Sequence, residues 1–258
     1  MTNSLRAEHA VITGAGRGIG AAIAHALASK GARISLLGRN RESLEKVAAE
    51  LGPSAETCAA VADVTDGATL QAAFARARER FGPVTVLVNN AGQARSAPLH
   101  VGDESLWNEM LAVNLHGVYR CIRCALPDML QAERGRIVNI ASTAGLTGYA
   151  YVTAYCAAKH GVIGLTRALA IELARKNITV NAVCPGYTDT DLSRDAIAAI
   201  QAKTGRPEAE VRAIFTAHNP QGRMVSSEEV AQTVLWLCTN DVGSITGQSI
   251  AVAGGELM

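Results

Sequence analysis

The 258-residue chain has no excess of charge of either sign, and this limits the partners that it can attract. Its 24 Lys and Arg residues balance 23 Asp and Glu residues, which leaves a net charge of +1. Binding to nucleic acid or to an anionic membrane depends on a positive field, so we expect neither partner. Proline is scarce, at 7 residues, and 48% of the chain is hydrophobic, which is typical of a globular protein.

Long hydrophobic runs are also missing. No uninterrupted apolar segment approaches the roughly 20 residues that a membrane-spanning helix needs. Residues 1–9 lack the basic region, apolar stretch and cleavage site of a signal peptide. We therefore expect a cytoplasmic protein with no membrane partner.

Cysteine is sparse and scattered. Six cysteines in a chain of this length do not form the dense pattern of a small disulfide-stapled domain, so we expect free thiols. Cys121 and Cys124 form a C-x-x-C without the second pair that tetrahedral zinc needs. The H-E-x-x-H and G-x-S-x-G patterns are absent as well. We expect no metal, and the residues of zinc proteases and of α/β-hydrolases are lacking.

Short apolar runs alternate with longer segments of helical periodicity along the whole chain. The runs are continuous and rich in Val and Ile, as in strands buried on both faces of a parallel sheet. They span 10–13, 33–37, 59–63, 84–89, 136–141, 178–183 and 248–252. Helices are expected at 21–30, 41–51, 68–81, 104–130, 154–176 and 227–239. The pattern predicts an α/β fold: a Rossmann-type doubly wound parallel sheet of about seven strands, with helices on both faces, in a single domain over 1–258.

One connection is much longer than the others. About forty residues separate the strand that ends near Val183 from the helix that begins near Ser227, where α/β connections usually take a handful. Pro207 suits a first helical turn and predicts a short helix over 208–217. Because ligands bind at the carboxyl ends of such strands, we interpret residues 187–222 as a substrate lid. A surface insertion without a function is the alternative.

A glycine-rich loop follows the first predicted strand. It runs from Thr13 to Gly20 with the pattern T-G-x-x-x-G-x-G. Glycine permits a tight turn with positive φ and lets backbone N–H groups approach a pyrophosphate, while the next helix presents its positive dipole end. Such loops give many false matches in isolation, so the dinucleotide site that it predicts depends on the rest of the chain.

Further motifs follow the loop in a fixed order. They are Asn89-Asn90-Ala91-Gly92 after the fourth strand, Asn114 in the next helix, Ser142 with Tyr155-Cys156-Ala157-Ala158-Lys159, and Pro185-Gly186. With these motifs the chain resembles the short-chain dehydrogenase/reductase family over essentially its whole length. Residues 135–185 look most like those of 3-oxoacyl-thioester, polyketide and cyclic-ketone reductases. The resemblance implies hydride transfer between a nicotinamide dinucleotide and a carbonyl or secondary alcohol.

The same resemblance implies which residues hold the cofactor. Asp63 and Val64 would be adenine neighbours, the turn 90–92 would form a wall beside the ribose, and the segment 185–190 would hold the nicotinamide carboxamide. The expected cofactor residues are Gly14, Arg17, Gly18, Ile19, Gly20, Arg39, Asp63, Val64, Asn90, Ala91, Gly92, Tyr155, Lys159, Pro185, Gly186, Thr188 and Thr190.

The charge of the protein side chains beside the adenosine ribose distinguishes sites that bind NADP from sites that bind NAD. NAD-binding folds carry an acidic residue at the end of the second strand, which accepts hydrogen bonds from the free ribose hydroxyls. This chain has no Asp or Glu between Gly20 and Glu42, whereas Arg39 follows the strand and Arg17 lies in the glycine loop. Relatives point such guanidinium groups at the 2′-phosphate, so we expect NADP, with NAD as the alternative.

Four residues are candidates for catalysis. Tyr155 and Lys159 are four apart on a predicted helix, so both side chains project from one face. An ammonium within about 4 to 6 Å would lower the tyrosine pKa and make the phenol a usable acid near neutral pH. Ser142 follows the fifth strand and would hydrogen-bond the substrate oxygen. The resemblance adds that Lys159 holds the nicotinamide ribose and that Asn114 orders a water beside the lysine.

We therefore expect an NADP-dependent short-chain dehydrogenase/reductase that acts on a 3-oxoacyl thioester or on a bulky or cyclic ketone. Tyr149 and Tyr151 would belong to the loop that shapes the substrate wall, and His160 to the helix surface. Three alternatives remain: an NAD-dependent alcohol dehydrogenase of the same family, a dinucleotide-sensing binding protein without turnover, and an epimerase or dehydratase relative. Whether the substrate is a CoA ester, carrier-bound or free stays open.

A homotetramer, built as a dimer of dimers, is also expected. Members of the family that the chain resembles pair through the helices that correspond to 104–130 and 154–176. The first of these carries a broad apolar spread that a monomer would leave facing solvent. Its members are Leu111, Leu115, Val118, Ile122 and Leu126.

Overall fold

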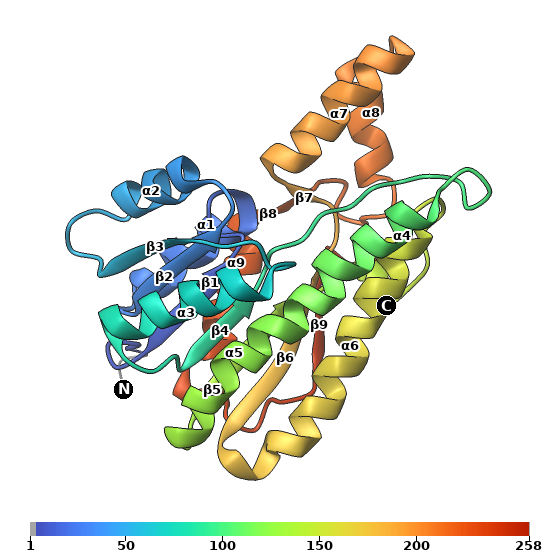
Figure 1. The fold of residues 1–258 in the computed structure, drawn as a ribbon. Helices are drawn as coiled ribbons and strands as arrows, with labels where there is room; N and C mark the ends of the chain where they lie inside the picture. The colour runs from blue at the N-terminus through green and yellow to red at the C-terminus, as the bar shows by residue number, and fades with distance from the viewer. Residues whose placement is uncertain (1–3, 258) are drawn as a thin grey trace.

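Seven parallel strands form the central sheet of the protein, in the order β3-β2-β1-β4-β5-β6-β9 (Figure 1). The computed structural model describes residues 4–257. The strands are β1 (His9–Thr13), β2 (Arg33–Gly38), β3 (Thr57–Val61), β4 (Val86–Asn89), β5 (Gly135–Ile140), β6 (Ile178–Pro185) and β9 (Ser249–Val252). The predicted doubly wound sheet is confirmed. β3 begins and ends two residues before its predicted range, so Asp63 lies in the loop after the strand.

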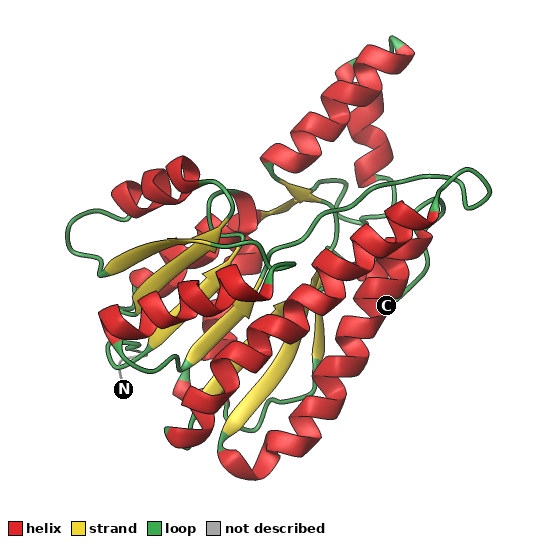
Figure 2. Cartoon of the chain, in the orientation of Figure 1, coloured by secondary structure: helices red, strands yellow, loops and turns green. Residues whose placement is uncertain are grey.

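Helices cover both faces of this sheet, as Figure 2 shows. One face holds α3 (Gly67–Phe81), α5 (Gly117–Gln131) and α6 (Thr153–Leu173), and the other holds α1 (Gly18–Ala28), α2 (Arg41–Glu50) and α9 (Ser227–Cys238). Each face has its own buried apolar cluster. Residues of β1, β4, β5 and β6 are therefore buried at every position, which explains why these strands read as continuous apolar runs.

The helix predicted over 104–130 is interrupted by a change of helical register. α4 (Glu104–Leu111) passes into a π-helical turn at Ala112–His116, and α5 follows. Asn114 lies within this turn and is fully buried. Single π-helical turns inside α-helices are frequent at functional sites. The sequence shows unbroken helical periodicity here and gives no sign of the turn.

The apolar spread along this helix faces the core of the protein itself. Val118 and Ile122 are each 4% exposed, and Leu115 and Leu126 pack against the same buried cluster. Four of its five members are therefore explained within one copy of the chain, whereas Leu111 is half-buried outside that cluster. The spread by itself does not indicate an interface. Large apolar side chains do remain exposed on α4, α5 and α6, but they are others. They are Trp107, Tyr119, Leu130 and Ile171.

The long connection between β6 and α9 forms a helical hairpin that projects from the body (Figure 1). It contains α7 (Asp191–Thr204) and α8 (Glu208–Thr216) and is flanked by a two-stranded ribbon of β7 (Thr188–Asp189) and β8 (Val225–Ser226). α8 matches the predicted helix, whereas α7 and the ribbon are new. Ile197, Val211 and Met224 form a small buried cluster of their own, so the hairpin has a separate apolar core.

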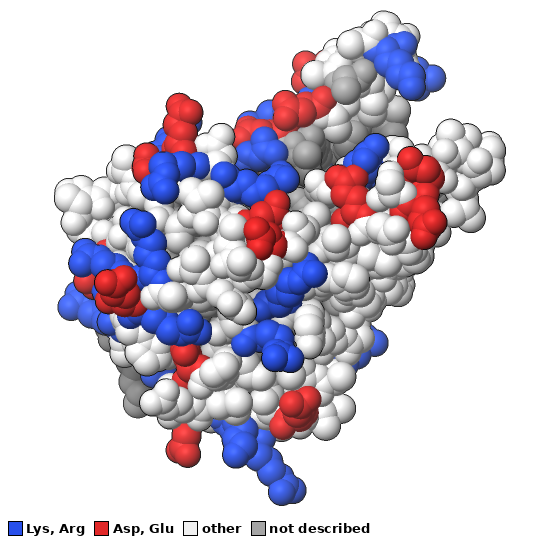
Figure 3. Space-filling model, viewed as in Figure 1, with Lys and Arg blue, Asp and Glu red and all other residues white. Residues whose placement is uncertain are grey.

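Charged side chains of both signs are interspersed over the face seen in Figure 3. Ion pairs join several of them, among them Arg78 with Asp128 at 2.8 Å and Arg95 with Glu109 at 2.6 Å. Over residues 4–257, every helix is too short or too polar to cross a bilayer.

Candidate active site

The glycine loop and the turn after β4 lie side by side because β1 and β4 are neighbours at the centre of the sheet. Thr13 Oγ1 accepts hydrogen bonds from the N–H groups of Asn90 and Ala91, both at 3.0 Å. The Asn90 amide donates to the carbonyls of Thr13 and Gly14, at 3.0 and 3.1 Å. Asn90 therefore braces the loop through its side chain. Thr13 was not among the predicted site residues, although it opens the glycine motif.

Two glycines of the loop are required by close backbone contact. A Cβ on Gly20 would lie 2.3 Å from the carbonyl oxygen of Gly14. Gly14 has φ of +65°, and a Cβ there would lie 2.9 Å from the Ala91 Cα. The loop can thus fold tightly against the turn after β4 only without side chains. A helix N-terminus such as that of α1, which follows the loop, is suited to bind phosphate.

The expected adenosine end of the site contains two exposed arginines. β2 ends at Gly38, so Arg39 follows at the position where NAD-binding folds carry an acid. Arg17 precedes α1 and is also exposed. Burial acts to raise the pKa of Asp63, but two hydrogen bonds from Thr65 and the charge of Arg39 outweigh it and lower that pKa. The Asp63 carboxylate therefore lies within the field of Arg39.

The N-terminus of α2 adds a feature that the sequence did not indicate. A Cβ on Gly16 would lie 2.4 Å from Ser43 Oγ, so the first turn of α2 packs against the glycine loop. Asn40 caps this helix by accepting a hydrogen bond from the Ser43 N–H at 3.0 Å. A helix N-terminus next to Arg17 and Arg39 favours a bound anion.

The side chains of Asn114 and Lys159 both lie beside Gly92. A Cβ on Gly92 would lie 2.9 Å from Asn114 Oδ1 and 3.7 Å from Lys159 Nζ. Asn114 is fixed by the backbone of Gln93, since it accepts from the Gln93 N–H at 3.1 Å and donates to the Gln93 carbonyl at 2.9 Å. Gln93 acts here through its backbone, which residue-type patterns cannot detect.

Lys159 is buried and directed at the end of β5. Its ammonium donates to the Ile140 carbonyl at 2.8 Å and lies 5.5 Å from the centre of the Tyr155 ring. Burial lowers the pKa of Lys159 to about 8. Burial also raises the pKa of Tyr155 to about 12, with the Ser142 hydroxyl acting in the opposite direction. The expectation that Lys159 lowers the phenol pKa is not met, because burial of the phenol prevails.

Ser142 follows β5 and precedes a 3-10 turn at Thr143–Gly145. Its Oγ accepts a hydrogen bond from the Ala144 N–H at 3.1 Å, which leaves the hydroxyl proton available. The Ser142 hydroxyl also faces the Tyr155 phenol. Two hydroxyl donors that face each other can bind one carbonyl oxygen between them, and the phenol can then deliver a proton to it.

The segment 185–190 runs from the end of β6 towards the glycine loop. Thr188 Oγ1 donates to the Gly186 carbonyl at 3.0 Å, and Thr190 caps α7. A Cβ on Gly18 would lie 3.3 Å from Thr190 Cγ2. The Thr188 hydroxyl therefore has a partner within this segment, and the Thr190 hydroxyl accepts from the Ser193 N–H of α7. The Thr190 side chain lies beside the glycine loop.

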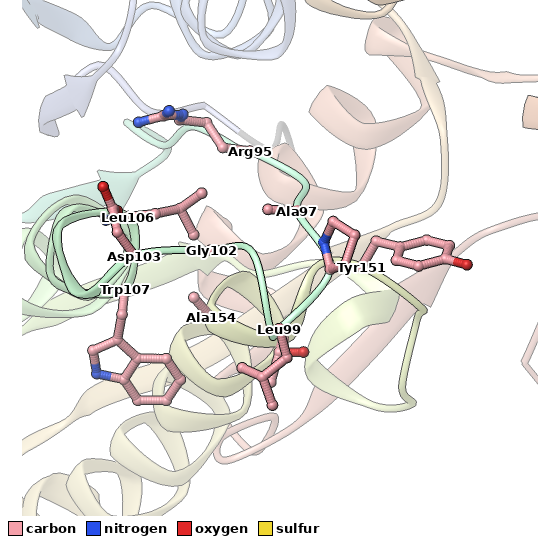
Figure 4. Close-up of a pocket in the computed structure, with 11 residues that line it drawn as sticks. Arg95, Ala97, Leu99, Gly102, Asp103, Leu106, Trp107, Tyr151 and Ala154 are labelled. Atoms are coloured by element: carbon pink, nitrogen blue, oxygen red, sulfur yellow. Dashed lines mark hydrogen bonds between the residues drawn. The ribbon is translucent and has the colours of Figure 1, made fainter.

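A small hollow adjoins the site between the loop after β4, α4 and the start of α6 (Figure 4). The Ala97 N–H donates to the Tyr151 carbonyl at 2.8 Å, which ties the loop to the residues before α6. The Tyr151 side chain is 64% exposed and extends away from the other lining residues. Tyr149 instead turns to the loop after β5, where its hydroxyl lies 2.9 Å from Thr143 Oγ1. Of the two tyrosines, Tyr149 is the one that contacts Thr143, the residue after Ser142.

Residues 8–201 match the family model described as short chain dehydrogenase. The chain is 42% identical over 253 residues to granaticin polyketide synthase putative ketoacyl reductase 1 of Streptomyces violaceoruber, covering 95% of this chain and 92% of that protein. It is 41% identical over 248 residues to cis-4-hydroxycyclohexanecarboxylate dehydrogenase of Sinomonas cyclohexanicum, covering 95% of each.

Solved structures show the same relationship. A crystal structure of actinorhodin polyketide ketoreductase with NADPH superposes on the chain with a TM-score of 0.92 at 38% identity. The superposition covers 99% of this chain and 98% of that one. The likeness therefore extends over the hairpin as well as the sheet.

Proposed function

Since the chain belongs to the short-chain dehydrogenase family, we propose that it is an NADP-dependent ketoreductase. Its substrate would be a 3-oxoacyl thioester or a bulky or cyclic ketone. The observation that carries this proposal is the convergence of Ser142, Tyr155, Lys159 and Asn114 beside the glycine loop. A dinucleotide-sensing protein has no need for a proton donor aligned in this way.

Each of these residues has a distinct part in the proposed reaction. Bound NADPH would supply the hydride. Ser142 holds the carbonyl oxygen, and Tyr155 donates the proton that completes the alcohol. Lys159, fixed by the Ile140 carbonyl, binds the nicotinamide ribose and keeps positive charge near the phenol as the proton leaves. Asn114 is held by Gln93 and faces Lys159 across Gly92, where a water could link the lysine to solvent.

The choice of NADP over NAD depends on Arg17 and Arg39. In this proposal the two guanidinium groups and the N-terminus of α2 bind the 2′-phosphate, while Asp63 and Val64 lie beside the adenine. The actinorhodin relative, solved with NADPH, supports this choice. Charge-assisted Arg–phosphate bonds are worth about 1.5 to 3 kcal/mol each, so two of them favour NADP by on the order of a hundredfold.

A comparison of kcat/KM for NADPH and NADH tests this assignment. The parent enzyme should prefer NADPH by about a hundredfold. Gly38→Asp combined with Arg39→Ala should remove most of that preference, because it places a carboxylate where the phosphate would lie. A parent that prefers NADH, or a double variant with an unchanged preference, would show that the phosphate site is elsewhere.

The hairpin of residues 187–222 is the proposed substrate lid. Tyr187, which follows the Pro185-Gly186 turn, contacts Phe215 of α8 edge to face with 4.9 Å between ring centres. This contact links the hairpin to the turn expected to hold the nicotinamide. Replacing residues 195–215 with a short flexible linker should leave the fold intact and reduce kcat/KM. An unfolded product would instead show that the hairpin belongs to the core.

We also propose that the chain assembles as a homotetramer, a dimer of dimers, through the outer faces of α5 and α6. Tyr119 of α5 is 49% exposed and Ile171 of α6 is 81% exposed. Large apolar side chains at such exposure mark an association surface when they gather on adjacent helices.

A further inference from the structure

The C-terminal segment returns to the catalytic edge of the sheet. After β9 the chain lies against the segment that leads back from the hairpin. A Cβ on Gly255 would lie 3.4 Å from the side chain of Pro220 in that segment. Glu256 then reaches the turn after β6: a Cβ on Gly186 would lie 2.7 Å from Glu256 Oε2. The Glu256 carboxylate therefore covers the backbone of the turn expected to hold the nicotinamide.

Tyr149 connects this carboxylate to the catalytic loop. Its hydroxyl donates to Glu256 Oε1 and lies 2.9 Å from the hydroxyl of Thr143, the residue after Ser142. A phenol has one proton, so Tyr149 donates to the carboxylate and accepts from Thr143. Burial and the hydrogen bond to Glu256 both raise the pKa of Tyr149, which keeps it protonated as the donor. The carboxylate is thus held in place between the Ser142 loop and Gly186.

Glu256 carries a charge that no ion pair among the described residues neutralises. Within residues 4–257, the ion pairs of the structure do not include Glu256. The Tyr149 hydroxyl donates to it, and the Glu256 charge, after burial, raises the pKa of Tyr187. A negative charge therefore lies between the loop after β5, which holds Ser142, and the turn after β6.

We propose that Glu256 is a specificity-determining residue that selects uncharged carbonyl substrates over those with an anionic group near the carbonyl. The inference rests on the proposed ketoreductase function. Two like charges several Å apart, in surroundings between water and the protein interior, repel by an amount worth about tenfold or more in binding. A carboxylate on the substrate would meet this repulsion, and its neutral ester would not.

Matched pairs of ketones test the proposal, beginning with 4-oxocyclohexanecarboxylate and its methyl ester. The measured quantity is the ratio of kcat/KM for the ester to that for the acid, with NADPH. Glu256→Gln keeps an acceptor for Tyr149 and removes the charge. We expect this variant to lower the ester-to-acid ratio about tenfold, mainly through KM for the acid. Where the acid is not reduced, its inhibition of ester reduction gives the same comparison.

Glu79→Gln is the matched control, because it removes the same charge from an exposed position on α3. It should leave the ester-to-acid ratio at the parent value. An equal ratio in the parent and in Glu256→Gln would overturn the inference and leave the reductase function intact. Failure of the parent to reduce any ketone with NADPH would overturn the reductase function itself.

Ionic strength gives a second test on the parent enzyme, which does not require a folded variant. Salt screens the repulsion between a partly exposed charge and an approaching anion. The acid should therefore gain kcat/KM relative to the ester as salt is raised. A ratio that does not move with salt would contradict the proposed role of Glu256.

Discussion

The Lys159 ammonium lies 5.5 Å from the centre of the Tyr155 ring, one helical turn away on α6, and donates its hydrogen bond to β5 at the Ile140 carbonyl. The amine is therefore positioned by the sheet as well as by its own helix. Ser142, two residues after Ile140, faces the same phenol. The packing of α6 on β5 and β6 thus fixes the distance between proton donor, hydroxyl and ammonium.

Replacing Tyr155 with Phe should remove turnover while sparing cofactor binding. The variant keeps the ring beneath the Lys159 ammonium and loses only the proton donor. Positioned proton transfer contributes about 10² to 10⁴ in rate, so kcat should fall by that amount. Steady-state kinetics and NADPH titration of the purified variant measure the two effects. A kcat within a few-fold of the parent would mean that another group supplies the proton.

Replacing Lys159 with Met should stabilise the fold in a way that depends on pH. Burial lowers the pKa of Lys159 from 10.5 to about 8 in the folded state. Below pH 8 the amine is charged in both states, so folding carries the full cost of burying the charge; above pH 10.5 it is neutral in both. The free energy of unfolding of the parent should therefore rise relative to that of the variant as pH rises from 8 to 10.5.

Urea unfolding across this pH range measures the effect. We expect Lys159→Met to be more stable than the parent by about 1 to 3 kcal/mol near neutral pH, with the advantage shrinking towards high pH. If the difference in unfolding free energy between variant and parent stays constant with pH, the amine of Lys159 is not buried in its charged form.

Replacing Gly20 with Ala should damage the cofactor site, because the new Cβ would meet the Gly14 carbonyl at 2.3 Å. The contact is with backbone, so the loop itself must move. NADPH affinity should fall at least about tenfold, which corresponds to about 1.4 kcal/mol. Gly67→Ala at the start of α3 is the control, since nothing lies within 4 Å of its Cβ position. Equal NADPH affinities in the two variants would argue against the glycine loop as the phosphate site.

Replacing Ile171 with Glu should break the proposed assembly without unfolding the subunit. The side chain is 81% exposed on α6, so the subunit itself has little need of it. A charge at the centre of an apolar interface costs several kcal/mol, enough to dissociate the tetramer at micromolar concentration. Light scattering should show a tetramer for the parent and a smaller species for the variant. A parent that scatters as a single 27 kDa chain would contradict the assembly.

The seven strands could be predicted because a doubly wound sheet buries both of its faces. The strands then appear as uninterrupted apolar runs, and each helix appears as a separate periodic segment. The hairpin was harder to predict from the sequence. Only a small apolar cluster packs against α7, so the helix lacks a strong apolar stripe. Its ends do carry signals that could have located it, namely the Thr190 and Ser193 capping box and Gly205 in the left-handed conformation.

The candidate site was accessible from the sequence where side-chain type carries the chemistry, as at Ser142, Tyr155 and Lys159. It was not accessible where contacts are distant in the chain or made by backbone. Tyr149 and Glu256 are 107 residues apart, and Gln93 holds Asn114 through main-chain atoms. The direction of the Tyr155 pKa was mistaken for a related reason: helical spacing reveals the nearby lysine but not the burial of the phenol.

The most direct test of the account is whether the purified protein converts ketones to alcohols with NADPH. A panel containing a 3-oxoacyl thioester and cyclic ketones should be mixed with NADPH, and both NADPH loss and alcohol formation should be measured. We predict that at least one ketone yields alcohol in equal amount to the NADPH oxidised, and that Tyr155→Phe forms almost none. Tight NADPH binding without alcohol from any member of the panel would contradict a ketoreductase and indicate a dinucleotide-sensing protein.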